Sequence, residues 1–170
     1  MIEEVFLKFS AGELQTLTGR IEDCLGRLTD DQIWMRGNEN ENSAGNLVLH
    51  LCGNVTQWIG TGVAGRPDQR DRASEFSARG GIGRADLVHM LRTTMTDAIS
   101  IIRDLPPARL SEHHTIQTHH DVILLEAIYH VVEHFGQHTA QIIFITKLMT
   151  GADLGYYGYL NKPRTSSVTP

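Results

Sequence analysis

Residues 120–149 read HDVILLEAIYHVVEHFGQHTAQIIFITKLM, and this stretch decides the fold class. Its apolar residues recur three and four positions apart, a spacing that places them on one face of a helix. We therefore predict a long amphipathic helix from about His120 to Met149, with Gly151 as its C-cap. The stripe steps through Leu124, Ile128, Val131 and Phe135 and resumes at Ile142, Ile145 and Met149.

The N-terminal segment shows the same periodicity. We expect a helix from about Ile2 to Leu28, followed by a short helical turn that starts at the capping-box pattern Thr29-Asp30-Asp31-Gln32. The turn would carry Ile33 and Trp34. The predicted stripe of the long helix comprises Phe6, Phe9, Leu14, Leu17, Ile21, Leu25 and Leu28.

Two further helices are predicted in the middle of the chain. One begins with Ser43 as its N-cap and fades between Gly60 and Gly65. The other spans roughly Arg84 to Leu105 and stops at Pro106-Pro107. The predicted buried residues are Leu47, Leu51, Val55 and Trp58 in the first and Leu87, Leu91, Met95, Ala98, Ile102 and Leu105 in the second.

The linker between these two helices, from Val63 to Gly83, indicates the topology. A helix of 20 residues is ~30 Å long, and extended chain covers ~3.3 Å per residue. The linker can therefore return along the whole bundle, which predicts that the second and third helices are parallel. Four long amphipathic helices are typical of an all-α four-helix bundle, here expected as one domain over residues 1–170. The polar stretch around His113, His114, His119 and His120 and the C-terminal tail, including Pro163 to Pro170, are expected to be irregular.

Composition excludes several function classes. The formal net charge is −5, and Lys and Arg are scattered, so neither nucleic-acid binding nor a basic membrane patch is expected. No apolar run reaches the ~20 residues of a membrane span, and the N-terminus resembles no secretory signal. Cys24 and Cys52 are expected to be reduced, buried thiols, and a cytoplasmic location is expected.

Histidines occupy positions where core residues are expected. His138 falls in the gap of the last stripe, His134 lies one turn before it, and His50 lies on or beside the inward face of the second helix. Burying imidazoles is costly unless their nitrogens are paired. Two histidines at i and i+4 with a third from a facing helix form a three-ligand set for a divalent metal ion, with positions left open for water or substrate.

Other readings of the histidines remain open. A single histidine on an apolar face is more often a hydrogen-bonded core residue, and His130 fits either a pocket role or ligation. The remaining histidines are expected in solvent. Cys52 points ~160° away from His50 around the helix and is excluded as a fourth ligand, whereas Gln141 could support the site by a hydrogen bond.

Two blocks of sequence resemble the DinB-like superfamily. Residues 42–54, NSAGNLVLHLCGN, followed by Gln57-Trp58-Ile59, resemble its second-helix block. Residues 130–142, HVVEHFGQHTAQI, resemble its fourth-helix block, with Ala140 where glycine is usual. The resemblance covers about residues 2 to 160. The stretch Asp68 to Phe76 looks like a feature of an uncharacterised subgroup.

The resemblance implies a four-helix bundle with a parallel middle pair and a nickel or zinc ion on His50, His134 and His138. Characterised relatives include S-transferases that use bacillithiol or mycothiol, so we expect metal-dependent S-transfer with a low-molecular-weight thiol. Metal-dependent hydrolysis, for which Glu126 and Glu133 are the available carboxylates, and a non-catalytic metal-binding role are the alternatives. Arg70 and Arg72 would either contact the thiol or face solvent unpaired.

A homodimer is expected as well. The resemblance implies one, and the last helix carries more apolar residues than one stripe needs. The residues off its main register are Ile123, Leu125, Val132, Ile143 and Phe144. Trp58 and Phe135 would either wall the bundle mouth or belong to the core.

Overall fold

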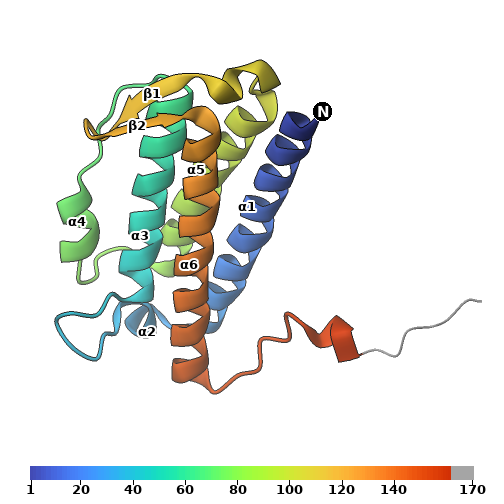
Figure 1. Ribbon diagram of the computed structural model, residues 1–170. Helices are drawn as coiled ribbons and strands as arrows, with labels where there is room; N and C mark the ends of the chain where they lie inside the picture. Colours follow the sequence, from blue (N-terminus) through green and yellow to red (C-terminus); the bar gives the residue numbers. More distant parts are fainter. Residues whose placement is uncertain (162–170) are drawn as a thin grey trace, which may run out of the picture.

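Four long helices form the frame of the protein in a computed structural model that describes residues 1–161. All four predicted helices are confirmed, and Figure 1 shows them packed side by side as a bundle. Their bounds are α1 Ile2–Arg27, α3 Ala44–Val55 with its continuation η1 Thr56–Val63, α5 Arg84–Asp104 and α6 Leu124–Thr150. The continuation η1 is a π-helix, a form of helix that is frequent at functional sites.

Helices α3 and α5 run in the same direction, as the long linker predicted. Arg92 of α5 pairs with Glu22 of α1, and Arg103 of α5 bonds Gln15, so α5 is antiparallel to α1. Trp58 stacks on His130 while His50 meets His138, so α3 and η1 are antiparallel to α6. Helices α1 and α6 both descend in Figure 1, which makes α3 and α5 the parallel pair.

The predicted local start and stop signals are present. The short helix α2, Asp30–Trp34, begins with a complete capping box between Thr29 and Gln32, and Ser43 caps α3 in the same way through Asn46. Gly151 adopts the left-handed conformation, with φ of 64°, that ends α6. Each of these signals acts within four residues of sequence.

The linker contains a helix that the sequence reading did not predict. Helix α4, Arg72–Ser77, starts at Asp71, whose side chain accepts a hydrogen bond from the Ser74 N–H, and lies beside α3 (Figure 1). The buried amide of Asn46 in α3 donates to the carbonyl oxygens of Glu75 and Ala78, at 2.9 Å each. These bonds attach α4 to the bundle.

The prediction of an irregular stretch around residues 113–120 was wrong, because these residues form a hairpin. Strand β1, His113–Ile116, pairs antiparallel with β2, His120–Ile123, so α6 begins at Leu124 rather than at His120. Ile116 is buried against Gly62 of η1, where an added Cβ would meet the Ile116 side chain at 2.4 Å. Contact with η1 thus favours the strand over a longer helix. A 3₁₀ turn, η2 Pro107–Ser111, precedes the hairpin.

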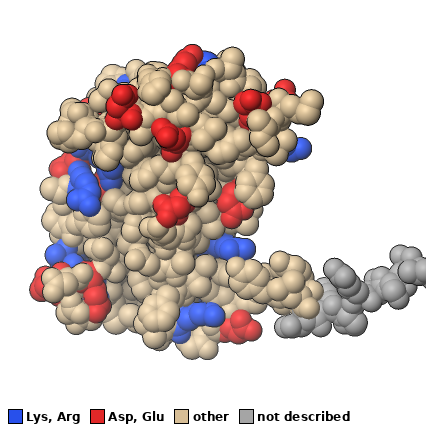
Figure 2. All heavy atoms as spheres, in the orientation of Figure 1, with Lys and Arg blue, Asp and Glu red and all other residues tan. Residues whose placement is uncertain are grey.

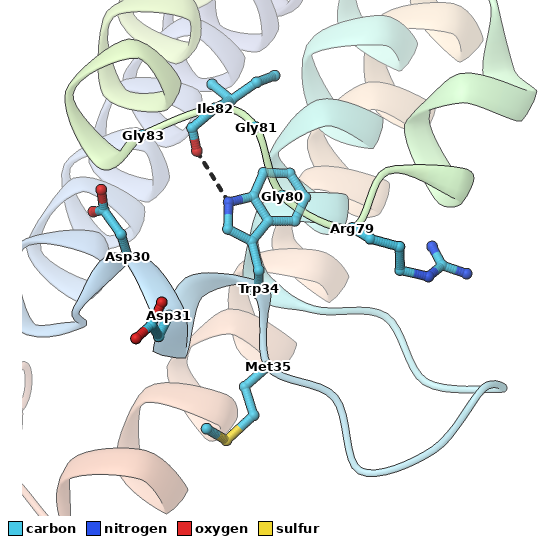
Figure 3. A pocket seen from close by; sticks show the side chains of 9 residues that line it. All are labelled: Asp30, Asp31, Trp34, Met35, Arg79, Gly80, Gly81, Ile82 and Gly83. Atoms are coloured by element: carbon cyan, nitrogen blue, oxygen red, sulfur yellow. Dashed lines mark hydrogen bonds between the residues drawn. The ribbon is translucent and has the colours of Figure 1, made fainter.

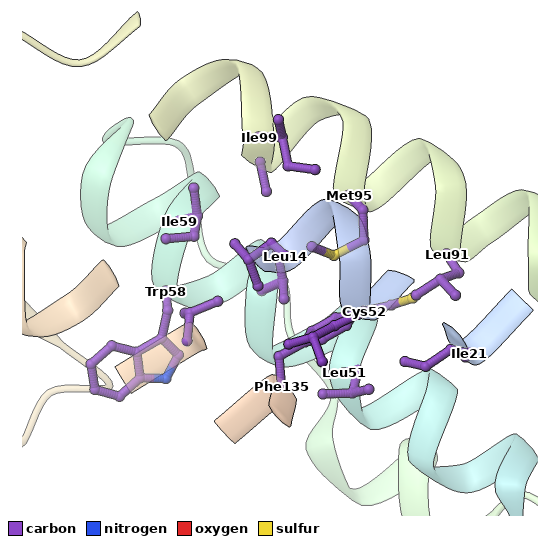
Figure 4. Close-up of a cluster of buried hydrophobic side chains, with 14 of the residues drawn as sticks. Leu14, Ile21, Leu51, Cys52, Trp58, Ile59, Leu91, Met95, Ile99 and Phe135 are labelled. Atoms are coloured by element: carbon purple, nitrogen blue, oxygen red, sulfur yellow. The ribbon is translucent and has the colours of Figure 1, made fainter. Parts of the chain in front are cut away.

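The core contains most of the predicted stripes, with two corrections. Every predicted residue of α5 is buried, and Figure 4 shows the cluster where α5 meets α1 and α3. Phe9 is 69% exposed, and Leu7 and Ala11 pack inward instead. Thr139 occupies the core position in the gap of the α6 apolar stripe after Phe135, and its hydroxyl donates to the Phe135 carbonyl oxygen at 2.7 Å. His138, which was predicted at this core position, is instead half-buried at the bundle surface.

The segment after α6 returns to α1. The Tyr156 hydroxyl donates to a carboxylate oxygen of Asp23 at 2.9 Å and lies 3.4 Å from Cys24 Sγ, and a 3₁₀ turn, η3 Gly158–Asn161, follows. The predicted irregularity of residues 163–170 lies outside the described residues. Both cysteines are free and buried, as expected.

The basic residues are scattered over the surface, as they are along the sequence. Figure 2 shows lysines and arginines interspersed with acidic residues over the visible face, without a basic patch on that face. Within the described chain, none of the helices combines the length and apolarity needed to cross a membrane.

Candidate metal centre

The three predicted histidines meet between α3 and α6. His50 comes from α3, and His134 and His138 lie one turn apart on α6. The Nε2 atom of His134 is 3.2 Å from Nε2 of His50 and 3.2 Å from Nε2 of His138. The structure therefore brings together one nitrogen from each of the three rings.

This spacing fits a metal ion. Two imidazole nitrogens at about 2.05 Å from one ion and 3.2 Å apart subtend an angle of about 100° at it, near the tetrahedral value. The three potential ligand atoms all lie within 4.8 Å of one another. The cluster of His50, His134 and His138 could therefore bind one metal ion, with a fourth position for another ligand.

The outer ring nitrogens of two histidines are hydrogen-bonded. His50 Nδ1 lies 2.9 Å from Glu75 Oε2, and His138 Nδ1 lies 2.7 Å from Gln141 Oε1. Arg70 Nη2, which can only donate, also lies 3.1 Å from His50 Nδ1. Carboxylate and amide oxygens only accept, so an Nδ1 that bonds to them carries the proton, and its Nε2 lone pair then faces the cluster centre. The predicted support from Gln141 is confirmed, with His138 as its partner.

Glu75 is a residue of this site that was not predicted from the sequence. It is 6% exposed, and Arg70 donates to both of its oxygens, from Nε at 2.7 Å and from Nη2 at 2.9 Å. Burial raises the pKa of the Glu75 carboxyl, but the hydrogen bonds from Arg70 and His50 outweigh it, and the pKa is lowered overall. Glu75 is therefore a carboxylate. The sequence feature that indicates its position is Asp71, the N-cap of α4, four residues before Glu75.

Arg70 and Arg72 differ in their surroundings. The expectation of an unpaired, solvent-facing side chain was wrong for Arg70, which is 4% exposed and also donates to Gln57 Oε1 at 2.9 Å. Arg72 is exposed, and its guanidinium carbon lies 4.7 Å from the centre of the Phe76 ring. Arg70 thus belongs to the support of the site, while Arg72 lies at its rim.

Two histidines of the cluster, His134 and His138, are in the form that binds metals. Burial lowers the pKa of His134 to about 3, with further lowering from the neighbouring His138, His50, His130 and Arg70. The pKa of His138 is lowered by burial as well. Both rings are therefore neutral near pH 7, which is the form that coordinates a cation.

A cavity of about 480 Å³ opens beside the cluster. Trp58 and His130 line it with ring centres 4.0 Å apart, which places His130 in the cavity wall and outside the three-nitrogen cluster. Phe135 is fully buried in the core and does not line the cavity. The lining residues are His50, Asn54, Trp58, Arg70, Arg72, Gln117, His120, Val122, Glu126, His130 and His134.

The hairpin contributes two residues that were expected in solvent or loop. Gln117 and His120 line the cavity, and the Gln117 amide donates to Gln57 Oε1. Gln117 and Thr118 both have positive φ, at 56° and 61°, which is uncommon for residues other than glycine. His113, His114 and His119 lie outside the cavity lining, as expected, and Cys52 faces a different part of the molecule.

The fold and the histidine cluster define a DinB-like helical bundle with a possible three-histidine metal site. The structure is similar to the crystal structure of a DinB-like protein (YjoA) from Bacillus subtilis, with a TM-score of 0.67 over 87% of this chain and 96% of that chain, at 16% identity. This likeness shows the fold. No curated protein matches the chain.

The family itself follows from the sequence match. Residues 2–162 match the family described as "Protein of unknown function (DUF1572)", and the chain belongs to this family. The resemblance to DinB-like proteins seen in the sequence is confirmed at the level of the fold.

Proposed function

We propose that the protein binds one divalent ion, nickel or zinc, through His50, His134 and His138, and uses it in S-transfer from a small thiol to an electrophile. The observation that carries the proposal is the set of three converging Nε2 atoms at the edge of a cavity of about 480 Å³. A three-ligand site with an open position is typical of a catalytic rather than a structural metal.

The ligand set favours a thiolate as the incoming ligand. Three neutral imidazoles leave a bound ion its full +2 charge, which lowers the pKa of an approaching thiol. The thiol would release its proton to solvent, its sulfur would form a bond to an electrophilic carbon, and the leaving group would depart with the electron pair of its former bond. No general base is required at the reacting carbon.

The residues of the chain would position the reactants. Glu75 and Gln141 hold two of the ligand rings, and Trp58 and His130 form an aromatic wall. That wall could admit an apolar electrophile.

Hydrolysis is the second candidate, because Glu126 lines the same cavity. Its Oε2, however, accepts the Ile123 N–H at 3.0 Å. Glu133 is exposed and hydrogen-bonded to Gln137, and Glu75 is held by Arg70. Each of these carboxylates thus already accepts a hydrogen bond from another group of the chain, which favours S-transfer over hydrolysis.

Thiol binding with and without metal tests the proposal. We expect zinc-loaded protein to bind small thiols and to release about one proton per thiol near neutral pH, whereas metal-free protein binds none. Metal analysis provides the check on the ligands: His138→Ala should lose stoichiometric metal, and His130→Ala should retain it. Thiol binding that does not depend on metal would refute S-transfer, and full metal retention in His138→Ala would refute the ligand set.

A further inference from the structure

Three buried side-chain polar atoms within residues 1–161 lack a hydrogen-bond partner, and they lie around one cavity. They are Asn54 Oδ1, Trp58 Nε1 and His134 Nδ1. Asn54 and Trp58 are each 4% exposed, and all three residues line the cavity beside the histidine cluster. A buried polar group without a partner is unfavourable, so such groups are rare in native proteins unless something binds them.

Comparable groups elsewhere in the protein have partners. Trp34 lines another cavity, of about 490 Å³, but its Nε1–H donates to the Ile82 carbonyl oxygen at 3.0 Å (Figure 3). Asn46, eight residues before Asn54 in α3, uses its amide to bond Glu75 and Ala78. The unpartnered atoms of Asn54 and Trp58 are therefore specific to the cavity at the candidate metal centre.

The positions of Asn54 and Trp58 limit what could bind them. They are four residues apart and so lie on one side of the helix, with Trp58 at the edge of the buried cluster in Figure 4. A donor and an acceptor on one wall match a group that accepts and donates on one side. A primary carboxamide has this geometry, since its C=O and one N–H point the same way.

We propose that Asn54 and Trp58 form a recognition subsite for a primary carboxamide or a hydroxyl of a small ligand. The Trp58 Nε1–H donates to the ligand oxygen, and Asn54 Oδ1 accepts the ligand N–H or O–H. Asn54 lies four residues after His50, about 6 Å along the helix. The polar atoms of the ligand would thus lie about four bonds from an atom bound at the cluster. The subsite itself does not depend on S-transfer.

The chain provides its own control for the measurement. Its two tryptophans, Trp34 and Trp58, give two indole N–H signals in an ¹H–¹⁵N NMR spectrum, assigned with Trp34→Phe and Trp58→Phe. The Trp34 N–H is already bonded to Ile82 and lies in another cavity. A ligand in the subsite should move the Trp58 signal and leave the Trp34 signal in place.

The first arm uses propionamide and zinc-loaded protein, with isobutanol as the hydroxyl probe. We expect either probe to shift the Trp58 indole signal in the wild type and neither to shift it in Asn54→Leu. That variant should keep its fold, because replacing an unpartnered buried amide by a similar apolar side chain removes no hydrogen bond. If neither probe moves the Trp58 signal relative to Trp34, the subsite does not exist and the atoms are met by solvent.

The second arm separates this inference from the proposed S-transfer. The first arm relies on metal binding alone, whereas this arm rests on thiol binding at the metal as well. β-Mercaptopropionamide is compared with isopentyl thiol, which has the same shape without the amide. We expect the amide to strengthen binding roughly five- to tenfold in the wild type and not in Asn54→Leu. Equal affinities of the two thiols for the wild type would overturn the carboxamide subsite. If β-mercaptopropionamide bound no more tightly than propionamide, only the proposed role of the sulfur would be overturned.

Discussion

Glu75 controls how one candidate ligand presents its ring. Its oxygen holds the Nδ1 proton of His50 and thereby leaves Nε2 free to bind a cation. The carboxylate stays charged although it is buried, because Arg70 donates to both of its oxygens. The negative charge of Glu75 thus acts on the candidate metal centre through His50 rather than by direct contact with a metal ion.

Replacing this carboxylate should weaken metal binding. We expect Glu75→Gln to lower zinc affinity roughly 10–100-fold, because His50 loses its charged partner and Arg70 leaves an unpaired positive charge near the ion. Removing one partner of a buried ion pair should also lower the free energy of unfolding by about 3 kcal/mol. Competition with a chromogenic chelator measures the affinity, and urea unfolding measures the stability.

Glu133→Gln is the matched control for Glu75→Gln. Glu133 lies next to His134 in sequence but is exposed and contacts Gln137 rather than a histidine. We expect it to keep wild-type zinc affinity. Wild-type affinity in Glu75→Gln as well would show that the carboxylate does not act on the metal centre.

Cys52 should be inert in the folded protein. Burial raises the pKa of its thiol to about 12 from an ordinary value of 9.0, so the reactive thiolate is nearly absent at pH 8. In a Cys24→Ser background, a disulfide reagent at pH 8 should find no thiol in native protein and one in guanidinium chloride. Rapid labelling of native protein would contradict this prediction.

The raised pKa of the Cys52 thiol also makes the stability of the protein depend on pH in the alkaline range. The folded-state pKa lies above the unfolded one, so the folded protein binds more protons between about pH 9 and pH 12. The contribution of Cys52 is therefore fully present below pH 9 and is lost as the pH rises through this window. Cys52→Ala should show a smaller loss of stability over this range.

At the scale of elements, the contact of α4 with α3 supports the site. Gly53 of α3 makes the contact possible, because an added Cβ would meet Glu75 Oε1 at 2.0 Å and Arg70 Nε at 3.1 Å. The glycine is needed for close approach rather than for its backbone conformation. Helix α4 and the Arg70–Glu75 pair therefore depend on a missing side chain in α3.

Gly53→Ala should displace the Glu75 carboxylate from His50. We expect a loss of about 1–3 kcal/mol in the free energy of unfolding from the steric conflict, together with weaker zinc binding. Gly19→Ala in α1 is the control: nothing lies within 4 Å of its added Cβ, so it should gain about 0.5–1 kcal/mol from helix propensity. If Gly53→Ala were stabilised as Gly19→Ala is, the proposed tight contact between α3 and α4 would be wrong.

At the scale of the whole molecule, exposed apolar residues on α6 support the expected homodimer. Leu125 is 36% exposed, Tyr129 and Phe144 are 62% exposed, and Leu148 is 66% exposed. The other off-register residues, Ile123, Val132 and Ile143, are partly buried within the protein. These side chains lie near both ends of α6, and exposed apolar patches often mark association surfaces.

Equilibrium sedimentation at micromolar concentration tests the dimer. We expect a dimer for the wild type and a folded monomer for Phe144→Glu combined with Leu148→Glu, because the charges would have to be buried in the interface. Thr93→Glu, an exposed position on α5, should leave the dimer intact. A monomeric wild type would rule the homodimer out.

Several features of this protein follow from short-range physics along the chain. The four helices and their caps depend on residues at most four apart, as Thr29 with Gln32 and Ser43 with Asn46 show. The pairing of His134 with His138 on one helix face is equally local, and the parallel arrangement of α3 and α5 follows from linker length. These features could be read from the chain before its fold was known.

Features that join distant residues depend instead on how the elements pack together. Glu75 reaches His50 from 25 positions away, and Gln117 reaches Gln57 from 60 positions away, so no local pattern reports either contact. The hairpin packs Ile116 against Gly62, and Thr139 rather than His138 is buried in the core. Burial and hydrogen-bond pairing of such groups depend on which elements pack together, which periodicity along the chain does not specify.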